Sequence, residues 1–204
     1  MKKLFILGIC LLLTSCFEIT EKIKHNSNQS GDYSLVIDFS NSWLKTKSAI
    51  LLEEVDGVSI PNEEDIKSKL AQFRADASKI KGTSKISTSY DFNTYVFKIN
   101  FSYNSIETLN AVLNTIDKKN SLVHFKNNNG RFERIASYPL PKDLAKKEDK
   151  KEDLLKANIT AVYTFDKDVA TVQNPNSKLS KSKKTVFLKQ NIWNVLNNNK
   201  LMNN

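Results

Sequence analysis

Residue types that carry much of enzyme chemistry are scarce in this chain. Its 204 residues include two cysteines, two histidines and five glycines. The two histidines, His25 and His124, lie in different parts of the sequence, whereas a metal site or a catalytic triad needs several convergent groups. The glycines form no G-x-G or G-K-S/T loop for a phosphate. The sequence therefore predicts no catalytic residue, no metal ligand and no cofactor site.

Both cysteines stand near the N-terminus, around a short apolar run. Lys2 and Lys3 precede residues 4–13, which carry no charge and are mostly large aliphatic residues. Ten residues are about half of the roughly 20 that a membrane-spanning helix needs. A positive start followed by a short apolar run is typical of a signal peptide, so residues 1–15 are predicted to be removed.

The apolar run ends in Leu13-Thr14-Ser15-Cys16. This stretch resembles the lipobox of bacterial lipoproteins, in which a branched residue and two small ones precede a cysteine. The resemblance implies that a signal peptidase recognises Leu13, Thr14 and Ser15, and that Cys16 carries a diacylglycerol and a further acyl chain such as palmitate. Two or more chains anchor a protein stably in a bilayer. The alternatives are a cysteine that merely follows an ordinary signal peptide, and a buried N-terminal helix.

The mature chain would have 189 residues, enough for one domain with a core. Cys16 would be its one cysteine, so it could form no internal disulfide. Loss of Lys2 and Lys3 lowers the net charge from +9 to +7. This balance is compatible with anionic lipid, but the even spread of asparagine along the chain favours a generally solvated surface over a specific basic patch. Besides the membrane, we expect anionic lipid or an envelope protein as partner. Nucleic acid is not expected, because Lys98 lies on the opposite strand face from the aromatic residues of 95–103.

Polar residues fill the segment that follows the anchor. Residues 16–32 end in Asn-Ser-Asn-Gln-Ser-Gly-Asp, a composition that predicts a flexible, lipidated tether. Glu18, Ile19, Thr20 and Ile23 leave a first strand open as an alternative. Residues 33–204 are predicted to form a single domain, in which the charge-dense segment 139–157 is a solvated helix.

Hydrophobic periodicity predicts an α+β fold for this domain. Alternation at period two predicts strands, and spacing of three to four residues predicts helices. In chain order the expected elements are a strand at 33–39, helices at 40–55 and 62–80, strands at 85–92 and 94–103, a helix at 104–116, and a strand at 121–126. The order suggests a ferredoxin-like βαββαβ unit, with extra strands toward the C-terminus. We expect an antiparallel or mixed sheet with helices packed on one face.

The lipobox and several later stretches together resemble the LppM-type envelope lipoproteins. These stretches are residues 28–38, 97–101, 109–110, 163–165 and 185–186. The resemblance implies an α/β domain held at the cell surface by lipid, and it transfers no catalytic residue.

The sequence thus predicts a membrane-anchored envelope lipoprotein that acts as a non-enzymatic binding or interaction module. The alternative is an envelope hydrolase whose serine and acidic residues converge only in the fold. It would require a cleft with a perturbed carboxylate, or a serine near His124. Phe17 follows Cys16 where some Gram-negative lineages place an aspartate for retention in the inner membrane. The outer membrane is therefore the favoured address.

Overall fold

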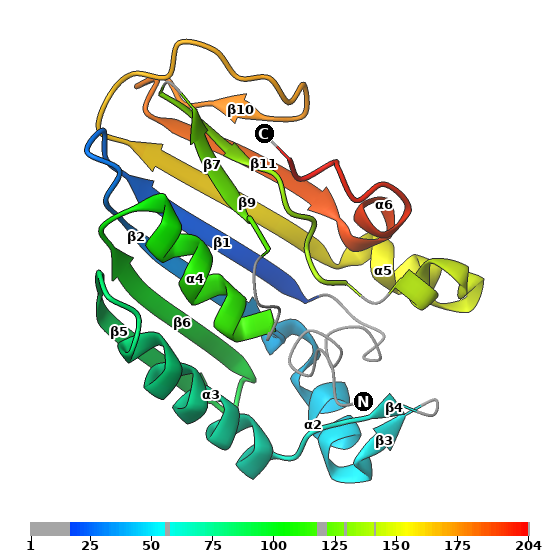
Figure 1. Cartoon of the computed structure of the whole chain (residues 1–204). Helices are drawn as coiled ribbons and strands as arrows, with labels where there is room; N and C mark the ends of the chain where they lie inside the picture. Colours follow the sequence, from blue (N-terminus) through cyan, green and yellow to red (C-terminus); the bar gives the residue numbers. More distant parts are fainter. Residues whose placement is uncertain (1–16, 56–57, 118–121, 129, 141, 204) are drawn as a thin grey trace.

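A seven-stranded sheet forms the centre of the molecule (Figure 1). The computed structural model describes residues 17–55, 58–117, 122–128, 130–140 and 142–203. The sheet has the strand order β10-β11-β9-β1-β2-β6-β5. Its strands are β1 (Glu18–His25), β2 (Gly31–Asp38), β5 (Thr83–Asp91), β6 (Val96–Tyr103), β9 (Asn158–Phe165), β10 (Lys178–Leu179) and β11 (Thr185–Asn191). All neighbouring pairs are antiparallel except β1 and β9, which run parallel.

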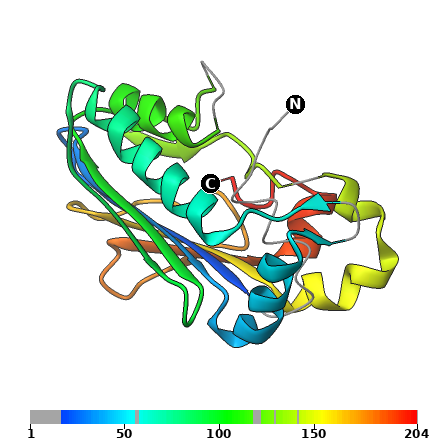
Figure 2. The same ribbon diagram turned by 90° about the horizontal axis from the view of Figure 1, so that it is seen from below.

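Helices lie on one face of this sheet and at one of its ends (Figure 2). The five α-helices are α2 (Trp43–Leu52), α3 (Glu63–Ser78), α4 (Ile106–Asp117), α5 (Lys151–Lys156) and α6 (Ile192–Asn197). Two hairpins, β3 (Glu54–Val55) with β4 (Val58–Ser59) and β7 (Phe125–Asn128) with β8 (Arg131–Arg134), form small separate sheets. The predicted α+β class with a mixed sheet and helices on one face is confirmed.

Strand alternation explains which face of the sheet is covered. In β6, Phe97, Ile99, Phe101 and Tyr103 are buried, whereas Lys98 on the other face is exposed. The inward-facing residues of β1, β2, β6 and β9 form the core with the apolar faces of α3 and α4. The predicted stripe of α3, Ile66, Leu70, Phe73 and Ala77, is buried throughout. Asn62 caps this helix by accepting a 2.9 Å hydrogen bond from the Asp65 amide.

The prediction of a flexible tether over 16–32 is wrong where the structure describes it. Residues 18–25 are β1, which lies at the centre of the sheet between β2 and β9. The Asn- and Ser-rich stretch is the short turn between β1 and β2, closed by a 2.8 Å hydrogen bond from the Asn26 amide to the Ser30 carbonyl. A charged residue, Glu21, occupies an inward-facing position of β1 and hides the alternation. Leu13, Thr14, Ser15 and Cys16 lie outside the described residues.

The ferredoxin-like order is realised for three of its four strands. Strands β5, β6 and β2 are neighbours, as the expected unit requires. The strand expected at 121–126 is instead β7, which pairs with β8 outside the main sheet. Strand β1 takes the position beside β2.

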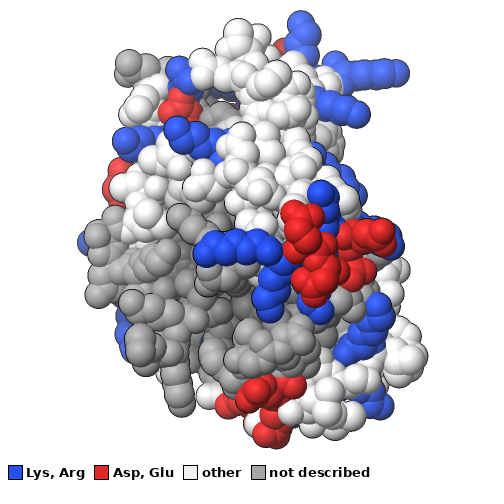
Figure 3. Space-filling view, turned by 90° about the vertical axis from the view of Figure 1, so that its right-hand side faces the viewer, with Lys and Arg blue, Asp and Glu red and all other residues white. Residues whose placement is uncertain are grey.

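Two local expectations also need correction. The N-terminal cap of α4 is Ser105 rather than Asn104, because the Ser105 hydroxyl accepts a 3.2 Å hydrogen bond from the Thr108 amide. The segment 139–157 does not form one helix. Its described part contains two short 3-10 turns, η2 (Lys142–Lys146) and η3 (Glu148–Lys150), followed by α5. Figure 3 shows acidic and basic side chains side by side on this side of the molecule.

Candidate functional site

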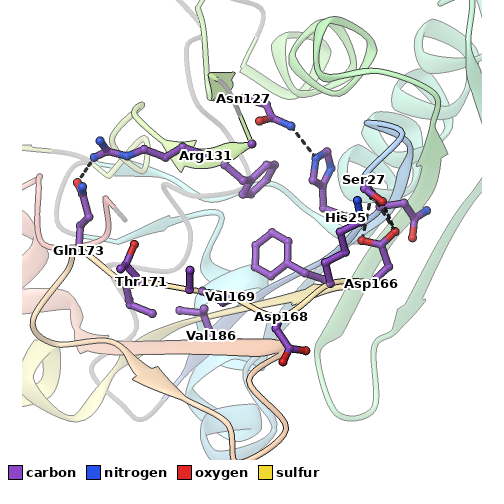
Figure 4. A pocket seen from close by; sticks show the side chains of 17 residues that line it. His25, Ser27, Asn127, Arg131, Asp166, Asp168, Val169, Thr171, Gln173 and Val186 are labelled. Atoms are coloured by element: carbon purple, nitrogen blue, oxygen red, sulfur yellow. Dashed lines mark hydrogen bonds between the residues drawn. The ribbon is translucent and has the colours of Figure 1, made fainter.

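A pocket of about 490 Å³ opens where β1 and β9 end. One of its walls is the β7–β8 hairpin, and the other is the loop that follows β9 (Figure 4). The lining residues are His25, Asn26, Ser27, Asn127, Gly130, Arg131, Phe132, residues 165–173 and Val186. This volume is within the range of small-molecule sites.

Aromatic rings form the inner part of the pocket. The ring of Phe132 lies 4.5 Å from that of His25 and 5.7 Å from that of Phe165, measured between centroids. Val186 of β11 contributes a further apolar side chain (Figure 4). A ligand with an aromatic or aliphatic body would find apolar contacts here.

His25 is the buried polar group of this pocket, with 4 % of its surface exposed. Its Nδ1 lies 3.0 Å from the Tyr103 hydroxyl and its Nε2 lies 3.3 Å from Asn127 Nδ2. Burial lowers the pKa of His25, and the negative charge of Asp166 opposes this only in part. The imidazole is therefore neutral at pH 7. Its Nε2 accepts from the Asn127 amide, and its Nδ1–H donates to Tyr103.

Polar contacts hold the rim of the pocket together. The Ser27 amide and hydroxyl both donate to the Asp166 carboxylate, the hydroxyl over 2.6 Å. These hydrogen bonds lower the pKa of Asp166. On the other side, Arg131 donates to the side chain of Gln173 and also forms an ion pair with Glu133. The loop after β9 is thus tied both to the β1–β2 turn and to the β7–β8 hairpin.

The pocket brings His25, Ser27 and Asp166 together without the geometry of a catalytic triad. A triad needs a hydrogen bond between the nucleophile and its base. Here the Ser27 hydroxyl donates to Asp166, while Nε2 of His25 faces Asn127. The arrangement can hold a ligand through apolar contacts and hydrogen bonds, and its Ser27 hydroxyl is hydrogen-bonded to Asp166 rather than to His25.

His124, near which the hydrolase alternative allowed a serine, lies elsewhere. It is buried beside α4, where its Nε2 is 3.2 Å from Asn114 Oδ1. Its amide donates to Asn110 Oδ1 over 2.9 Å. Both contacts fix the segment before β7 against α4, as expected for a packed side chain.

A buried polar cluster at the middle of the sheet escaped prediction. We call it the Glu21 cluster: Glu21, Tyr33, Arg134, Tyr138 and Tyr163. Arg134 donates to both Glu21 oxygens, over 3.0 and 2.7 Å, and both residues are almost fully buried. The three tyrosine hydroxyls donate to the same carboxylate over 2.7 to 3.1 Å.

The electrostatics of the Glu21 cluster follow from burial. Loss of solvent raises the pKa of Tyr33, Tyr138 and Tyr163, and the Glu21 charge raises each further. Burial is the largest single influence on Arg134 and would lower its pKa, but the Glu21 carboxylate and the three tyrosines together outweigh it and raise the pKa. The tyrosines therefore stay protonated and Arg134 stays charged. The cluster is a closed structural network with all of its named groups facing one another.

Within the described ranges, no three His, Cys, Asp or Glu side chains gather in a way that suits a metal ion. None of the helices that the structure describes is both long and apolar enough to cross a bilayer.

Comparison with known proteins gives one fold-level likeness. No protein-family model and no curated protein sequence matches the chain. Among solved structures, it is similar to the NMR structure of the folded domain of LppM from Mycobacterium tuberculosis. The sequence identity is 11 % and the TM-score is 0.45, over 95 % of this chain and 89 % of that one.

Proposed function

We propose that this protein is a lipid-anchored binding protein of the bacterial envelope. Acyl chains on Cys16 attach it to a membrane, and the pocket beside His25 takes up a small ligand. The lipobox sequence supports the anchor. The observation that carries the binding role is the pocket of about 490 Å³. In it, His25 is neutral and Ser27 is hydrogen-bonded to Asp166.

The pocket lining indicates the chemistry of the ligand. Phe132, Phe165 and Val186 suit an aromatic or aliphatic body. Arg131 and Lys167 lie at the pocket as well, so an acidic or strongly hydrogen-bonding group on the ligand would be complemented. We infer a small amphiphilic molecule with one apolar and one acidic part.

Anilinonaphthalene sulfonate, which combines these two parts, is a direct probe of the pocket. Ala170 lines the pocket and is exposed, so Ala170→Trp fills the space without disturbing the core. We expect this variant of the full chain to bind the dye about tenfold more weakly, a loss of about 1.4 kcal/mol. Leu179→Trp, at an exposed position of β10 outside the pocket, is the matched control. Equal affinities of the two variants would place the dye elsewhere and contradict the proposal.

The anchor is tested by mass spectrometry of protein taken from cells that make the full chain. We expect a mature N-terminus at Cys16 with a diacylglycerol and a further acyl chain. Cys16→Ala should accumulate as an unprocessed, unlabelled precursor in cells fed radiolabelled palmitate. Density fractionation of the same cells tests the outer membrane as its address. A wild-type chain cut at another residue and free of lipid would refute the anchor.

A further inference from the structure

Helix α2 presents an apolar surface to solvent. Nine large apolar side chains are exposed among the residues that the structure describes, and four of them belong to this one helix. They are Trp43, Leu44, Leu51 and Leu52, which are 47 %, 61 %, 74 % and 69 % exposed. Isolated exposed leucines are ordinary, but several on one short helix mark a contact surface.

The helical spacing places Leu44 and Leu51 together on the outward side, with Trp43 and Leu52 about a quarter turn to either side of them. Leu44 and Leu51 are seven residues apart, which is close to two turns, so they lie above one another. Thr46, Ala49 and Ile50 are buried on the opposite side. A helix that is apolar on both sides normally has a second apolar environment beside it. The core of the protein covers the inner side of α2, whereas no part of the described chain covers its outward side.

The start of β1 lies at this same end of the molecule (Figure 1). Phe17 is 3 % exposed, and its ring lies 5.5 Å from that of Phe39, which directly precedes η1 (Ser40–Ser42) and α2. Consecutive Cα atoms are about 3.8 Å apart, so Cys16 is within one residue of this packed position. No flexible tether separates Cys16 from the body, and lipid attached there would begin beside α2.

The charges around the apolar surface match a phospholipid headgroup layer. Lys45 and Lys47 are exposed on α2, which itself carries no acidic residue, and the exposed Glu53 and Glu54 follow its C-terminal end. Lysine side chains can extend from an apolar surface to the headgroups while their methylene groups stay in contact with it. Each lysine near an anionic membrane surface adds a favourable electrostatic contribution.

We propose that the outward side of α2 lies in the interface of the bilayer that holds Cys16. Trp43, Leu44, Leu51 and Leu52 enter the boundary of the acyl chains, and Lys45 and Lys47 meet anionic headgroups. This inference rests on the proposed lipidation of Cys16. In this arrangement the body of the protein is a fixed projection from the membrane rather than a domain on a flexible tether.

Trp43 itself can report on this contact. The chain has two tryptophans, so Trp193→Phe leaves Trp43 as the single one. The full lipidated protein is reconstituted in protein-free vesicles of phosphatidylglycerol and phosphatidylethanolamine. We expect phospholipids brominated on their acyl chains to quench Trp43 fluorescence, and aqueous iodide to lose its access. Replacing Leu44 and Leu51 by glutamine, a good helix former, should restore the access of iodide.

Exposed apolar residues elsewhere provide the matched control. Leu179→Gln with Phe187→Gln removes two exposed apolar side chains from β10 and β11, at the other edge of the sheet (Figure 1). This pair should leave the quenching of Trp43 by brominated lipid unchanged. The four glutamine substitutions are at exposed positions, whereas Trp193 is half-buried and packs against the core. Circular dichroism verifies that each variant, Trp193→Phe included, is folded.

The outcomes separate this inference from the proposed function. A lipidated protein whose Trp43 stays open to iodide in vesicles overturns the inference and leaves the anchor intact. Shielding of Trp43 that needs envelope proteins, and is absent in protein-free vesicles, also overturns it. If Cys16 proves unmodified, the anchor fails, and mixing the full chain with the same vesicles decides the role of α2. Binding that falls at least about tenfold in the Leu44→Gln, Leu51→Gln variant then supports it, and no binding refutes it.

Discussion

The two ends of β1 face different surroundings. At the Phe17 end, the strand begins beside α2, whose exposed side chains are leucine, tryptophan and lysine. At the His25 end, it opens into a pocket with aromatic walls and a polar rim. An eight-residue strand separates the two regions by roughly 25 Å. The proposed attachment site and the proposed ligand site would thus occupy opposite ends of one strand, so neither surface would compete with the other.

The middle of β1 determines how firmly the two ends are coupled. Glu21 lies there, and Arg134 fixes it to the β7–β8 hairpin, which is also a wall of the pocket. A loss of this ion pair would loosen the pocket wall as well as the sheet. The following predictions test the coupling and then each end, from the largest expected effect to the smallest.

Arg134→Met should lower the free energy of unfolding by about 3–5 kcal/mol, because it leaves the Glu21 carboxylate buried without its cation. Urea denaturation of the full chain measures the change. Combining it with Glu21→Leu should recover much of the loss, since no buried charge remains. Arg131→Met, in the same strand but exposed, should cost less than about 1 kcal/mol. If the two arginine variants lose the same free energy of unfolding, the buried ion pair contributes no more to stability than an exposed arginine does.

Phe17→Ala should cost about 3 kcal/mol, because a buried aromatic ring is replaced by a cavity next to Phe39. The same urea experiment measures it. Phe187→Ala, which removes an exposed ring, should change the stability by less than about 0.5 kcal/mol. A negligible effect of Phe17→Ala would mean that the body does not hold the chain next to Cys16 firmly, and the fixed projection would be untenable.

Gly31→Ala should cost about 2 kcal/mol at the pocket end. A Cβ at this position would collide with the Lys24 carbonyl and the Tyr103 hydroxyl, and overpacked sites typically lose 1–3 kcal/mol. Tyr103 is a hydrogen-bond partner of His25, so binding of anilinonaphthalene sulfonate should weaken as well. Ser34→Ala, further along β2, is the control for an ordinary substitution. Unchanged stability and dye binding would show that Tyr103 does not hold His25 in place.

The smallest expected effect is on the pH dependence of stability. Because burial lowers the pKa of His25 below its ordinary 6.5, the unfolded chain binds a proton that the folded chain excludes as the pH falls through 6.5. The stability gained by keeping His25 neutral in the folded protein is therefore fully present above pH 6.5, and it declines as the pH falls below that value. Thermal unfolding between pH 8 and pH 5 should therefore show a slope that His25→Asn reduces. An identical slope in both proteins would contradict a neutral, buried His25.

The sequence predicts those elements whose buried faces are regular. Helix α3 has an asparagine cap and an apolar stripe, and β6 alternates without exception, so both were predicted correctly. Strand β1 was left as an alternative to a tether because Glu21 breaks its inward-facing row. The residue that neutralises Glu21 stands 113 positions later, and periodicity within a short window contains no information on such a partner.

The pocket could not be predicted for a related reason. Its lining comes from four separated parts of the chain, around residues 25–27, 127–132, 165–173 and 186. These parts are strand ends, the turns and loops beside them, and one position of β11, and none of them carries a recognisable binding motif. Only the parallel pairing of β1 with β9 brings their ends to one place. The sequence offered one sign of such a distant contact. It is Glu21, a charged residue at an inward-facing position of β1, whose partner Arg134 belongs to the hairpin that lines the pocket.

The parallel pairing of β1 and β9 also determines the order in which the chain can assemble. Glu18 pairs with Asn158, so the first strand to be synthesised waits for one that follows 140 residues later. Such long-range closure is slow in folding, and the sheet has no complete centre until most of the polypeptide has emerged. For the exported protein proposed above, this late closure would keep the chain unfolded during its passage through a secretion channel.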